Sequence, residues 1–229
     1  NNCVNNWFET TNGTADYYNT ASPNPDNDIP NNVLGTQSAR TGNAYSGFYT
    51  YETGCGASYR EYLTVQLSSP LVSGTSYDAE MYVSWASEGV TEATNNIGML
   101  FTTSIPSSSG ATGCGAGTNF INATAQVKTV AVITNSAGWT LISGTFVAAA
   151  NFTYLTIGNF NNDATTTQNS GGNGNNCAFC SYYFVEDVCV IAAGNSCIGA
   201  LPVAFLSFDA KSNAGKVHLG WTTASEINN

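Results

Sequence analysis

Apolar and polar side chains alternate along most of this chain, which is the pattern of half-buried β-strands. In the segment 77–85 every second residue is apolar or aromatic: Tyr77, Ala79, Met81, Val83 and Trp85. The same period of two marks the segments 43–51, 59–67, 96–103, 126–134, 139–147, 152–159 and 181–191. No segment keeps a helical period over its length. The pattern therefore predicts an all-β fold, an antiparallel sandwich of two sheets.

Three long polar segments separate these strands, at 19–32, 104–119 and 159–176. Because they consist largely of Asn, Ser, Thr, Gly and Pro, we expect solvated loops. A boundary near Gly199 predicts a sandwich over 1–199 and a β-hairpin tail over 200–229. The apolar positions of the tail are Leu201, Val203, Phe205, Phe208, Val217, Leu219 and Trp221. Two strands alone are marginal in water, so the tail must continue beyond this sequence or pack on something else.

The charge balance excludes whole classes of partner. Charged residues make up only 9% of the chain, and fifteen acidic residues oppose five basic ones, which gives a formal charge of −10. Nucleic acids and anionic membranes are therefore not expected to bind. No stretch approaches the roughly 20 apolar residues of a membrane span, so we expect no membrane insertion. Seven cysteines indicate an oxidising, extracellular compartment.

Several motifs, taken in their order along the chain, resemble one family. They include Gly42-Asn43-Ala44-Tyr45, Arg60-Glu61-Tyr62, Gly138-Trp139 and Tyr182-Tyr183-Phe184-Val185. Roughly residues 7–191 are similar to a jelly-roll module of bacterial outer-surface proteins, which itself looks like carbohydrate-binding jelly rolls of the galactose-binding type. In similar modules a first strand with an Asn-Pro-Ser-Phe-Glu-like motif lies upstream of the Trp7 region. We expect that strand to be missing from this sequence.

The tail from Leu201 to Asn229 resembles the start of a fibronectin-III-like segment. Such segments commonly precede the sorting domain of proteins exported by the type IX secretion system. The resemblance therefore implies export to the bacterial cell surface or the medium.

Asp187 is the main candidate for a metal ligand. It shares a strand face with Val185 and Cys189, so we expect its carboxylate to point toward the core and to need a partner. That partner is a structural Ca²⁺ ion, Arg60 or backbone N–H groups. In the resembling modules the Asp at this point helps to bind structural Ca²⁺. Glu9 and Asp16 are weaker candidates, and an acidic chain suits this ion.

The cysteines are interpreted as structural disulfides. Cys177 and Cys180 form a C-x-x-C pair, but no second such pair exists to complete a zinc site, and a redox role is the less favoured alternative. Pairing of Cys189 with Cys197 and of Cys55 with Cys114 fits their spacing and context. Seven is an odd number, so one thiol is free or has its partner elsewhere.

Aromatic residues are the candidates for glycan binding, because sugar C–H faces pack on flat rings. Tyr49 and Tyr51 share a strand face and are expected to form an exposed platform, to which Trp7 contributes. Trp85 and Trp139 lie in alternating strands and are expected in the core. Arg60 and Glu61 are adjacent and are interpreted as a structural ion pair.

The sequence gives little support for catalysis. The only histidine is His218 in the tail, and no Gly-x-Ser-x-Gly or phosphate-binding loop is present. Glu186 and Asp187 are adjacent on one strand, so they are expected to point to opposite faces and not to act as a carboxylate pair. We therefore expect no enzyme activity.

The sequence is compatible with two functions. The first is an extracellular adhesin or fibre subunit that assembles by β-strand addition through the tail. The alternative is a carbohydrate-binding module of a larger secreted protein. The expected partners are accordingly other copies of the chain or surface glycans.

Overall fold

The computed structural model of the chain describes residues 6–11, 13–54, 58–108, 120–197, 205–213 and 216–223. The chain divides into two compact units, Asn1–Asn195 and Ser196–Asn229. In the described ranges, no helix has the length and apolar character needed to cross a membrane.

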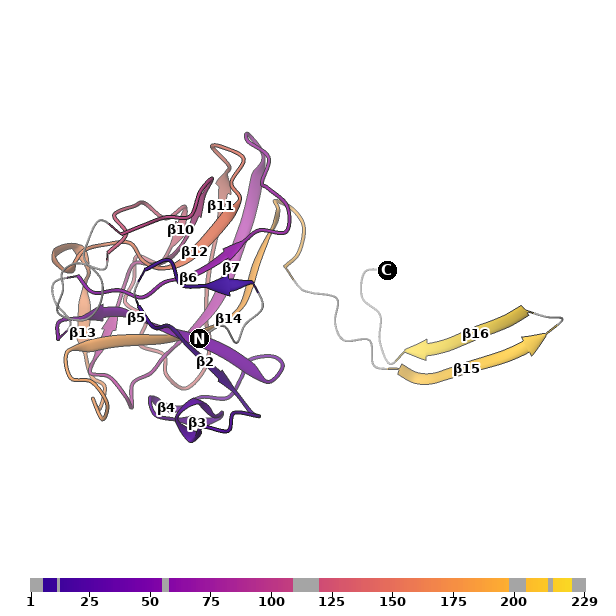
Figure 1. Cartoon of the computed structure of the whole chain (residues 1–229), viewed down its shortest axis with the longest axis horizontal. Helices are drawn as coiled ribbons and strands as arrows, with labels where there is room; N and C mark the ends of the chain where they lie inside the picture. The colour runs from indigo at the N-terminus through magenta and orange to yellow at the C-terminus, as the bar shows by residue number, and fades with distance from the viewer. Residues whose placement is uncertain are drawn as a thin grey trace. The chain divides into compact units, whose positions relative to one another are not determined.

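The first unit is a sandwich of two antiparallel five-stranded sheets (Figure 1). In spatial order, the first sheet contains β1 (Trp7–Phe8), β6 (Leu63–Gln66), β12 (Tyr154–Asn159), β9 (Ile97–Thr102) and β10 (Val127–Lys128). The second contains β11 (Thr140–Val147), β7 (Ser76–Trp85), β14 (Cys180–Ala192), β5 (Ala44–Glu52) and β2 (Asp16–Asn19). The predicted jelly-roll sandwich is thus confirmed.

Several short elements lie outside the two large sheets. Two small antiparallel pairs are β8 (Glu92–Thr94) with β13 (Gln168–Ser170) and β3 (Asn31–Asn32) with β4 (Gly35–Thr36). Two 3₁₀ turns are η1 (Pro25–Asn27) and η2 (Asp163–Thr165). These elements are too short for a period of two to be visible, so the alternation did not predict them.

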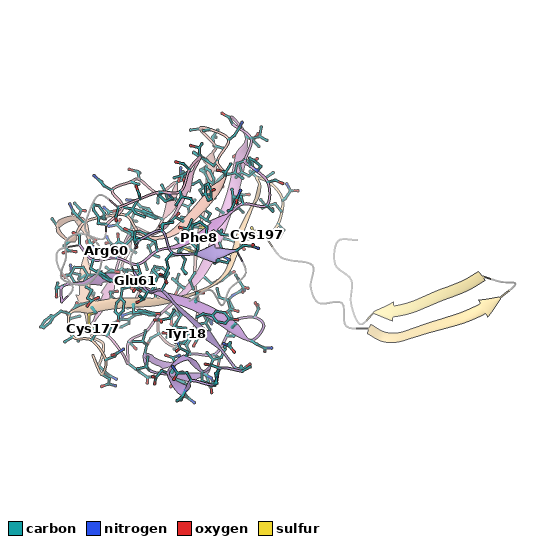
Figure 2. The ribbon with its side chains drawn as sticks, viewed as in Figure 1. Phe8, Tyr18, Arg60, Glu61, Cys177 and Cys197 are labelled. Atoms are coloured by element: carbon teal, nitrogen blue, oxygen red, sulfur yellow. A yellow bond between two sulfur atoms is a disulfide. The ribbon has the colours of Figure 1, made fainter. Side chains whose placement is uncertain are left out.

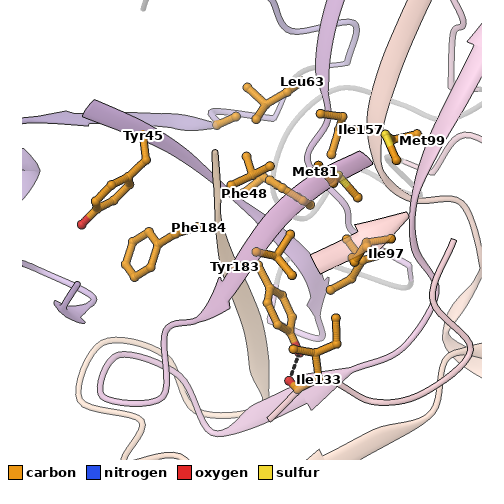
Figure 3. Packing of buried hydrophobic residues seen from close by; sticks show 14 of the residues in the cluster. Tyr45, Phe48, Leu63, Met81, Ile97, Met99, Ile133, Ile157, Tyr183 and Phe184 are labelled. Carbon is orange, nitrogen blue, oxygen red and sulfur yellow. Dashed lines mark hydrogen bonds between the residues drawn. The ribbon is translucent and has the colours of Figure 1, made fainter. Parts of the chain in front are cut away.

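The core lies between the two large sheets, where the alternating apolar side chains meet (Figure 3). Met81 and Val83 of β7 are completely buried, and Trp85 is 6% exposed, which confirms the prediction that Trp85 is a core residue. Tyr183 of β14 is also fully buried, and its hydroxyl donates to the Ile133 carbonyl at 2.6 Å. The polar end of this ring is therefore satisfied inside the core.

A second aromatic layer covers the outer face of the second sheet. Phe184 makes ring contacts with Tyr18, Tyr45 and Tyr182 at centroid distances of 5.3, 4.9 and 5.8 Å. The Tyr45 hydroxyl donates to the Gln37 carbonyl at 2.9 Å. This hydrogen bond connects the aromatic layer to the segment around Gln37, which covers it.

Residues 29–38 form this covering segment, and its first part overlaps the end of the predicted solvated loop 19–32. Within the loop 19–32, Ile29 is buried, at 6% exposed, and the other residues are exposed or half-buried, so the expected solvated loop is wrong only at Ile29. Leu34, just after the loop, is 2% exposed. The aromatic layer offers the loop an apolar surface to bury, and a composition-based prediction does not include that surface.

Two predicted strands are much shorter than their alternation suggested. Only Val127–Lys128 of the segment 126–134 and Leu63–Gln66 of the segment 59–67 pair in the sheet. Arg60 and Glu61 are both almost completely buried, so burial does not alternate along the chain before Leu63. A single bridge between Tyr59 and Glu52, the Glu61 N–H donated to the Tyr49 carbonyl, and side-chain hydrogen bonds hold this part of the chain in place of a full strand ladder.

The second unit contains the antiparallel hairpin of β15 (Phe205–Asn213) and β16 (Lys216–Thr223). In its register Phe208 lies opposite Trp221, and Ser212 lies opposite Val217. The predicted tail hairpin is confirmed, whereas Leu201 and Val203 lie outside the described residues.

Candidate functional site

An open cleft of about 340 Å³ lies between the sheets, on the side where β1 and β2 are the edge strands. The first sheet contributes Trp7, Leu63 and Ile157. The second sheet contributes Tyr17, the stretch from Ala44 to Ser46, and the stretch from Val185 to Val188. The cleft therefore combines an aliphatic floor, aromatic rings and two carboxylates, Glu186 and Asp187.

The aromatic walls come from the two short edge strands. Trp7 of β1 lies opposite Val65 in the first sheet, is half-buried and packs against the core. Tyr17 of β2 lies opposite Ser46 in the second sheet and is also half-buried. Of the predicted glycan-binding residues, Trp7 therefore lines the cleft, whereas Tyr49 and Tyr51 do not.

A β-bulge shapes the acidic side of the cleft. The register of β14 against β7 shifts between Glu186 and Cys189, and Asp187 has a φ of +51°. A left-handed conformation at a residue other than glycine costs about 1–3 kcal/mol and persists only where its surroundings hold it. Such bulges redirect side chains from the positions that regular alternation would give them.

Because of the bulge, the side chains of Glu186 and Asp187 both contact the loop at Arg40 and Thr41. Glu186 accepts the backbone N–H groups of Arg40 and Thr41 at 2.6 and 2.7 Å. Asp187 accepts the Thr41 hydroxyl at 2.6 Å and forms an ion pair with Arg40. Burial raises the pKa of Glu186, and the two N–H groups oppose that rise.

Two expectations about Asp187 are therefore wrong. Its side chain does not point into the core but is 27% exposed, and its partner is Arg40 rather than Arg60. Nor do Glu186 and Asp187 lie on opposite faces, because both contact Thr41. The bulge interrupts the alternation on which both expectations depended.

Arg40 is clamped between this carboxylate and an aromatic ring. Its guanidinium carbon lies 3.4 Å from the ring centroid of Tyr82 on β7, while the same group pairs with Asp187. A cation stacked on a ring and paired with a carboxylate is held in one orientation. This clamp fixes the loop at the rim of the cleft.

Glu61 organises a second polar network near β2 (Figure 2). Its carboxylate accepts the N–H groups of Thr14 and Tyr49 at 2.9 and 3.0 Å, together with the hydroxyls of Thr14 and Tyr59 at 3.3 Å each. Burial raises the pKa of Glu61 to about 7, although these donors favour the charged form. Glu61 is therefore a structural anchor for the chain around β2 and β5.

The predicted ion pair of Arg60 with Glu61 is wrong. Arg60 is fully buried and donates to Asp163 at 2.9 Å, to the Tyr59 carbonyl at 2.7 Å and to the Asn161 carbonyl at 3.1 Å. Residues adjacent in an extended chain point in opposite directions, so Arg60 and Glu61 enter separate networks.

Glu9 and Asp16 lie close to the Glu61 network. Asp16 accepts the Tyr182 hydroxyl at 2.9 Å, and burial raises its pKa. Burial also raises the pKa of Glu9, and the negative charge of Asp16 adds to that rise. Both carboxyl groups are half-buried, which is the physical cause of the raised pKa values.

The three predicted metal ligands Asp187, Glu9 and Asp16 do not converge. Within the described part of the chain, the one group of three acidic, Cys or His residues with ligand atoms within 4.8 Å of one another is Glu52, Cys177 and Cys180. The two cysteines of that group are disulfide-bonded to each other. Calcium binding by this chain stays a prediction.

The expected exposed platform of Tyr49 and Tyr51 is wrong. Tyr51 is only 8% exposed, and its ring centroid lies 5.4 Å from the Arg60 guanidinium carbon. Tyr49 is half-buried and packs edge-on against Tyr182 at 4.8 Å. Both rings join the packing on the outer face of the second sheet, a face that the sequence pattern predicts to be solvated.

Trp139 occupies an intermediate position. It packs against the core but is half-buried, and its indole N–H donates to the Ser38 carbonyl at 3.1 Å. The side chain thus connects the start of β11 to the covering segment.

Disulfides occur where the cysteine spacing indicated. Cys177 and Cys180 are bonded to each other, and Cys189 and Cys197 are both in disulfide form. Cys55 and Cys114 lie outside the described residues. Disulfides of this kind form in oxidising compartments.

Sequence reasoning missed Tyr17 and Ser46, which line the cleft. It also missed Arg40 and Thr41, which bind the two carboxylates of the cleft. For Tyr17 and Ser46 the sequence contains a weak indication of a site, because a ring or a hydroxyl that points inward from a strand is suited to line a cavity. Arg40 was visible as one of only five basic residues in the chain. Its pairing with Asp187 had no signal in the sequence, because the two residues are 147 positions apart.

No protein-family model matches the chain, and no curated protein matches it. Solved structures that are similar to this chain include the following three, all at low identity. The CBM22-1–GH10 modules of endo-1,4-β-D-xylanase 10B from Clostridium thermocellum, complexed with xylohexaose, match 83% of this chain with a TM-score of 0.42 and 12% identity. The match covers 27% of that xylanase chain.

A cleaved adhesin domain of Lys-gingipain from Porphyromonas gingivalis matches with a TM-score of 0.42 and 13% identity. The CBM22-2 xylan-binding domain from Paenibacillus barcinonensis Xyn10C matches with a TM-score of 0.39 and 11% identity. Each covers 83% of this chain and 93% of the matched chain. These likenesses concern the fold alone.

Proposed function

We propose that this protein is a non-catalytic, extracellular binding module that holds a surface or matrix glycan in the cleft between β1 and β2. The cleft itself carries the proposal, because it places the rings of Trp7 and Tyr17 beside the carboxylates of Glu186 and Asp187. Export by the type IX system is part of the same proposal, and the disulfides support an extracellular location.

The chemistry of the cleft suits a sugar. Its volume of about 340 Å³ lies within the roughly 300–1,000 Å³ of small-molecule sites. Sugar rings present C–H faces that pack on aromatic rings, and their hydroxyls donate to carboxylates. Each oxygen of the Asp187 carboxylate has a protein donor, and two lone pairs per oxygen leave room for a hydroxyl of the ligand.

The net charge narrows the class of glycan. With a formal charge of −10 and two carboxylates at the rim of the cleft, uronic-acid polymers are repelled. The proposed ligands are therefore neutral glycans or glycans with amino sugars.

A Trp7→Ala variant tests this proposal. We expect a glycan array to identify a bound neutral or amino-sugar glycan, and calorimetry to show at least about tenfold weaker binding by the variant, since a buried ring is a typical hot spot. Tyr154→Ala is the matched control, because Tyr154 is also half-buried but lies outside the cleft. Binding that is equal in both variants, or absent from every glycan, rejects the proposal.

Strand addition is the second candidate function, and the floor of the cleft favours it. Leu63, Ile157 and Val185 line the cleft although they come from the inner strands of both sheets. The flanking edge strands β1 and β2 are only two and four residues long. An apolar strand from a neighbouring copy, such as β15, would cover this floor and extend an edge, which makes open fibres.

Deleting residues 201–229 separates the two candidates. If the tail donates a strand, negative-stain images of the full chain contain filaments, and those of the shortened chain do not. A glycan-binding module keeps its affinity after the same deletion, because the described residues that line the cleft all belong to the first unit. Filaments that persist in the shortened chain contradict strand donation.

A further inference from the structure

The four edges of the sandwich differ in length. β1 and β10 contain two residues each and β2 contains four, whereas β11 contains eight, from Thr140 to Val147. Short edge strands protect a sheet from pairing with another chain, because they present few unpaired backbone groups. Among the strands that the structure describes, β11 is therefore the longest edge available for pairing with another chain.

The backbone groups of every second β11 residue point away from the sheet. Directly after β11, the Ala148 N–H donates to the Thr75 carbonyl at 2.9 Å, so residue 148 faces the β7 side. Neighbouring residues of an antiparallel strand face opposite sides, and β11 keeps an unbroken register with β7 along its whole length. The residues that face the open edge are thus Leu141, Ser143, Thr145 and Val147.

β11 also lacks the features that normally block strand addition. It contains no charged residue, no proline and no bulge. Leu141 and Val147, near the two ends of the strand, share the outer face and are 46% and 62% exposed. The chain carries a formal charge of −10, but none of that charge lies on this strand to repel a second copy.

The sequence of β11 is self-complementary about its centre. When two copies run antiparallel with Gly144 at the two-fold axis, Leu141 lies opposite Val147, and Ser143 lies opposite Thr145. Ile142 and Phe146, which are both buried in the core, also lie opposite each other. Apolar side chains thus meet apolar ones and hydroxyls meet hydroxyls, which are favourable cross-strand pairs.

The same register satisfies the backbone. Interchain hydrogen bonds require two edge-facing residues to lie opposite each other, and both Leu141 with Val147 and Ser143 with Thr145 meet that condition. Gly144 falls at a position without interchain hydrogen bonds, where strands approach most closely, and it has no side chain to obstruct the approach.

We propose that this protein forms a two-fold symmetric dimer in which β11 pairs with β11 of a second copy. The second sheets of the two copies then join into one continuous sheet across the axis. The contact is isologous, so it closes after two copies and does not propagate. One strand pair buries a small area, so the dimer dissociates on dilution. This inference does not depend on the glycan cleft, which lies on the side of β1 and β2.

Sedimentation velocity of the full chain tests the proposal. Across about 1 to 500 µM, we expect the mass to rise from 23.9 kDa toward twice that value. The variant S143K/T145K is expected to remain monomeric, because each introduced lysine lies opposite a lysine of the other copy. Within one chain these positions are paired with Glu80 and Asp78, so the lysines are accommodated by the fold.

A mixture of oppositely charged variants is expected to restore dimer formation. The variant S143E/T145E alone is expected to be monomeric, and an equimolar mixture with S143K/T145K is expected to form a one-to-one dimer. Circular dichroism of each variant establishes that it is folded. A wild-type chain that stays at 23.9 kDa up to about 500 µM overturns the proposal, as does a lysine variant that dimerises like the wild type.

Discussion

Replacing Gly47 by alanine is expected to destabilise the sandwich by about 3 kcal/mol, near the upper end of the usual cost of overpacking. Gly47 lies in the middle of β5, under the ring of Tyr182 from β14. A Cβ atom at Gly47 would lie 2.4 Å from a ring carbon and 2.5 Å from the hydroxyl of Tyr182. These distances are far inside van der Waals contact, so the ring or the strand must move.

Tyr182 has little freedom to move. It is fully buried, its hydroxyl lies 3.1 Å from the Tyr18 hydroxyl, and it donates to Asp16 at 2.9 Å. Its ring also packs against Tyr49 and Phe184. Displacing Tyr182 therefore disturbs the aromatic layer as a whole.

Thermal unfolding measures this effect. For a protein of this size, about 3 kcal/mol corresponds to a fall of roughly 6–12 °C in the melting temperature. Gly138→Ala is the matched control, because a Cβ atom there meets nothing within 4 Å. Melting of both variants within about 1 °C of the wild type would show that the close approach at Gly47 is not essential.

Replacing Asp163 by asparagine is expected to cost about 3 kcal/mol, because the change removes a carboxylate that pairs with a buried positive charge. The Arg60 side chain is 0% exposed, and the oxygen of Asp163 lies 2.9 Å from its guanidinium. Other acceptors of Arg60 include the neutral carbonyls of Tyr59 and Asn161 and the hydroxyl of Thr166, which stabilise the charge less than a carboxylate does.

The ion pair of Arg40 with Asp187 supplies the comparison. Its side chains are 34% and 27% exposed, so solvent screens the charges, and Asp187→Asn is expected to cost less than about 1 kcal/mol. Urea unfolding at neutral pH measures both variants against the wild type, with an unchanged slope showing that the comparison is valid. Equal losses for the two variants would contradict the assignment of Arg60 as the buried structural cation.

The sequence predicted the strands that bury one face over many residues. The segments 77–85 and 139–147 nearly coincide with β7 and β11, because alternation over eight or more residues has one consistent inner face. The prediction of a strand over 59–67 is wrong in its first half, where Arg60 and Glu61 are both buried. Their partners Asp163 and Thr14 are far away in the chain, so no local pattern indicated this burial.

The candidate site was predicted in part. Trp7 lines the cleft, and Asp187 lies at its rim. The orientation of Asp187 was predicted wrongly, because a bulge with a positive φ has no signature in the residues Glu186 and Asp187 themselves. Tyr49 and Tyr51 were placed on an exposed platform, because no local pattern indicated that Tyr182 packs on Tyr49 and Arg60 on Tyr51.

The amino-acid sequence by itself determined that this protein is a disulfide-containing antiparallel sandwich with an acidic surface, followed by a hairpin. These properties follow from the period of two, the cysteine spacing and the charge count, which are local or summed quantities. Only the tertiary structure decided where the aromatic layer is covered, where the cleft opens and which edge strand is long. Those features arise from contacts between residues more than a hundred positions apart, such as Arg40 with Asp187 and Arg60 with Asp163, and the energies of such contacts depend on burial that no single segment specifies.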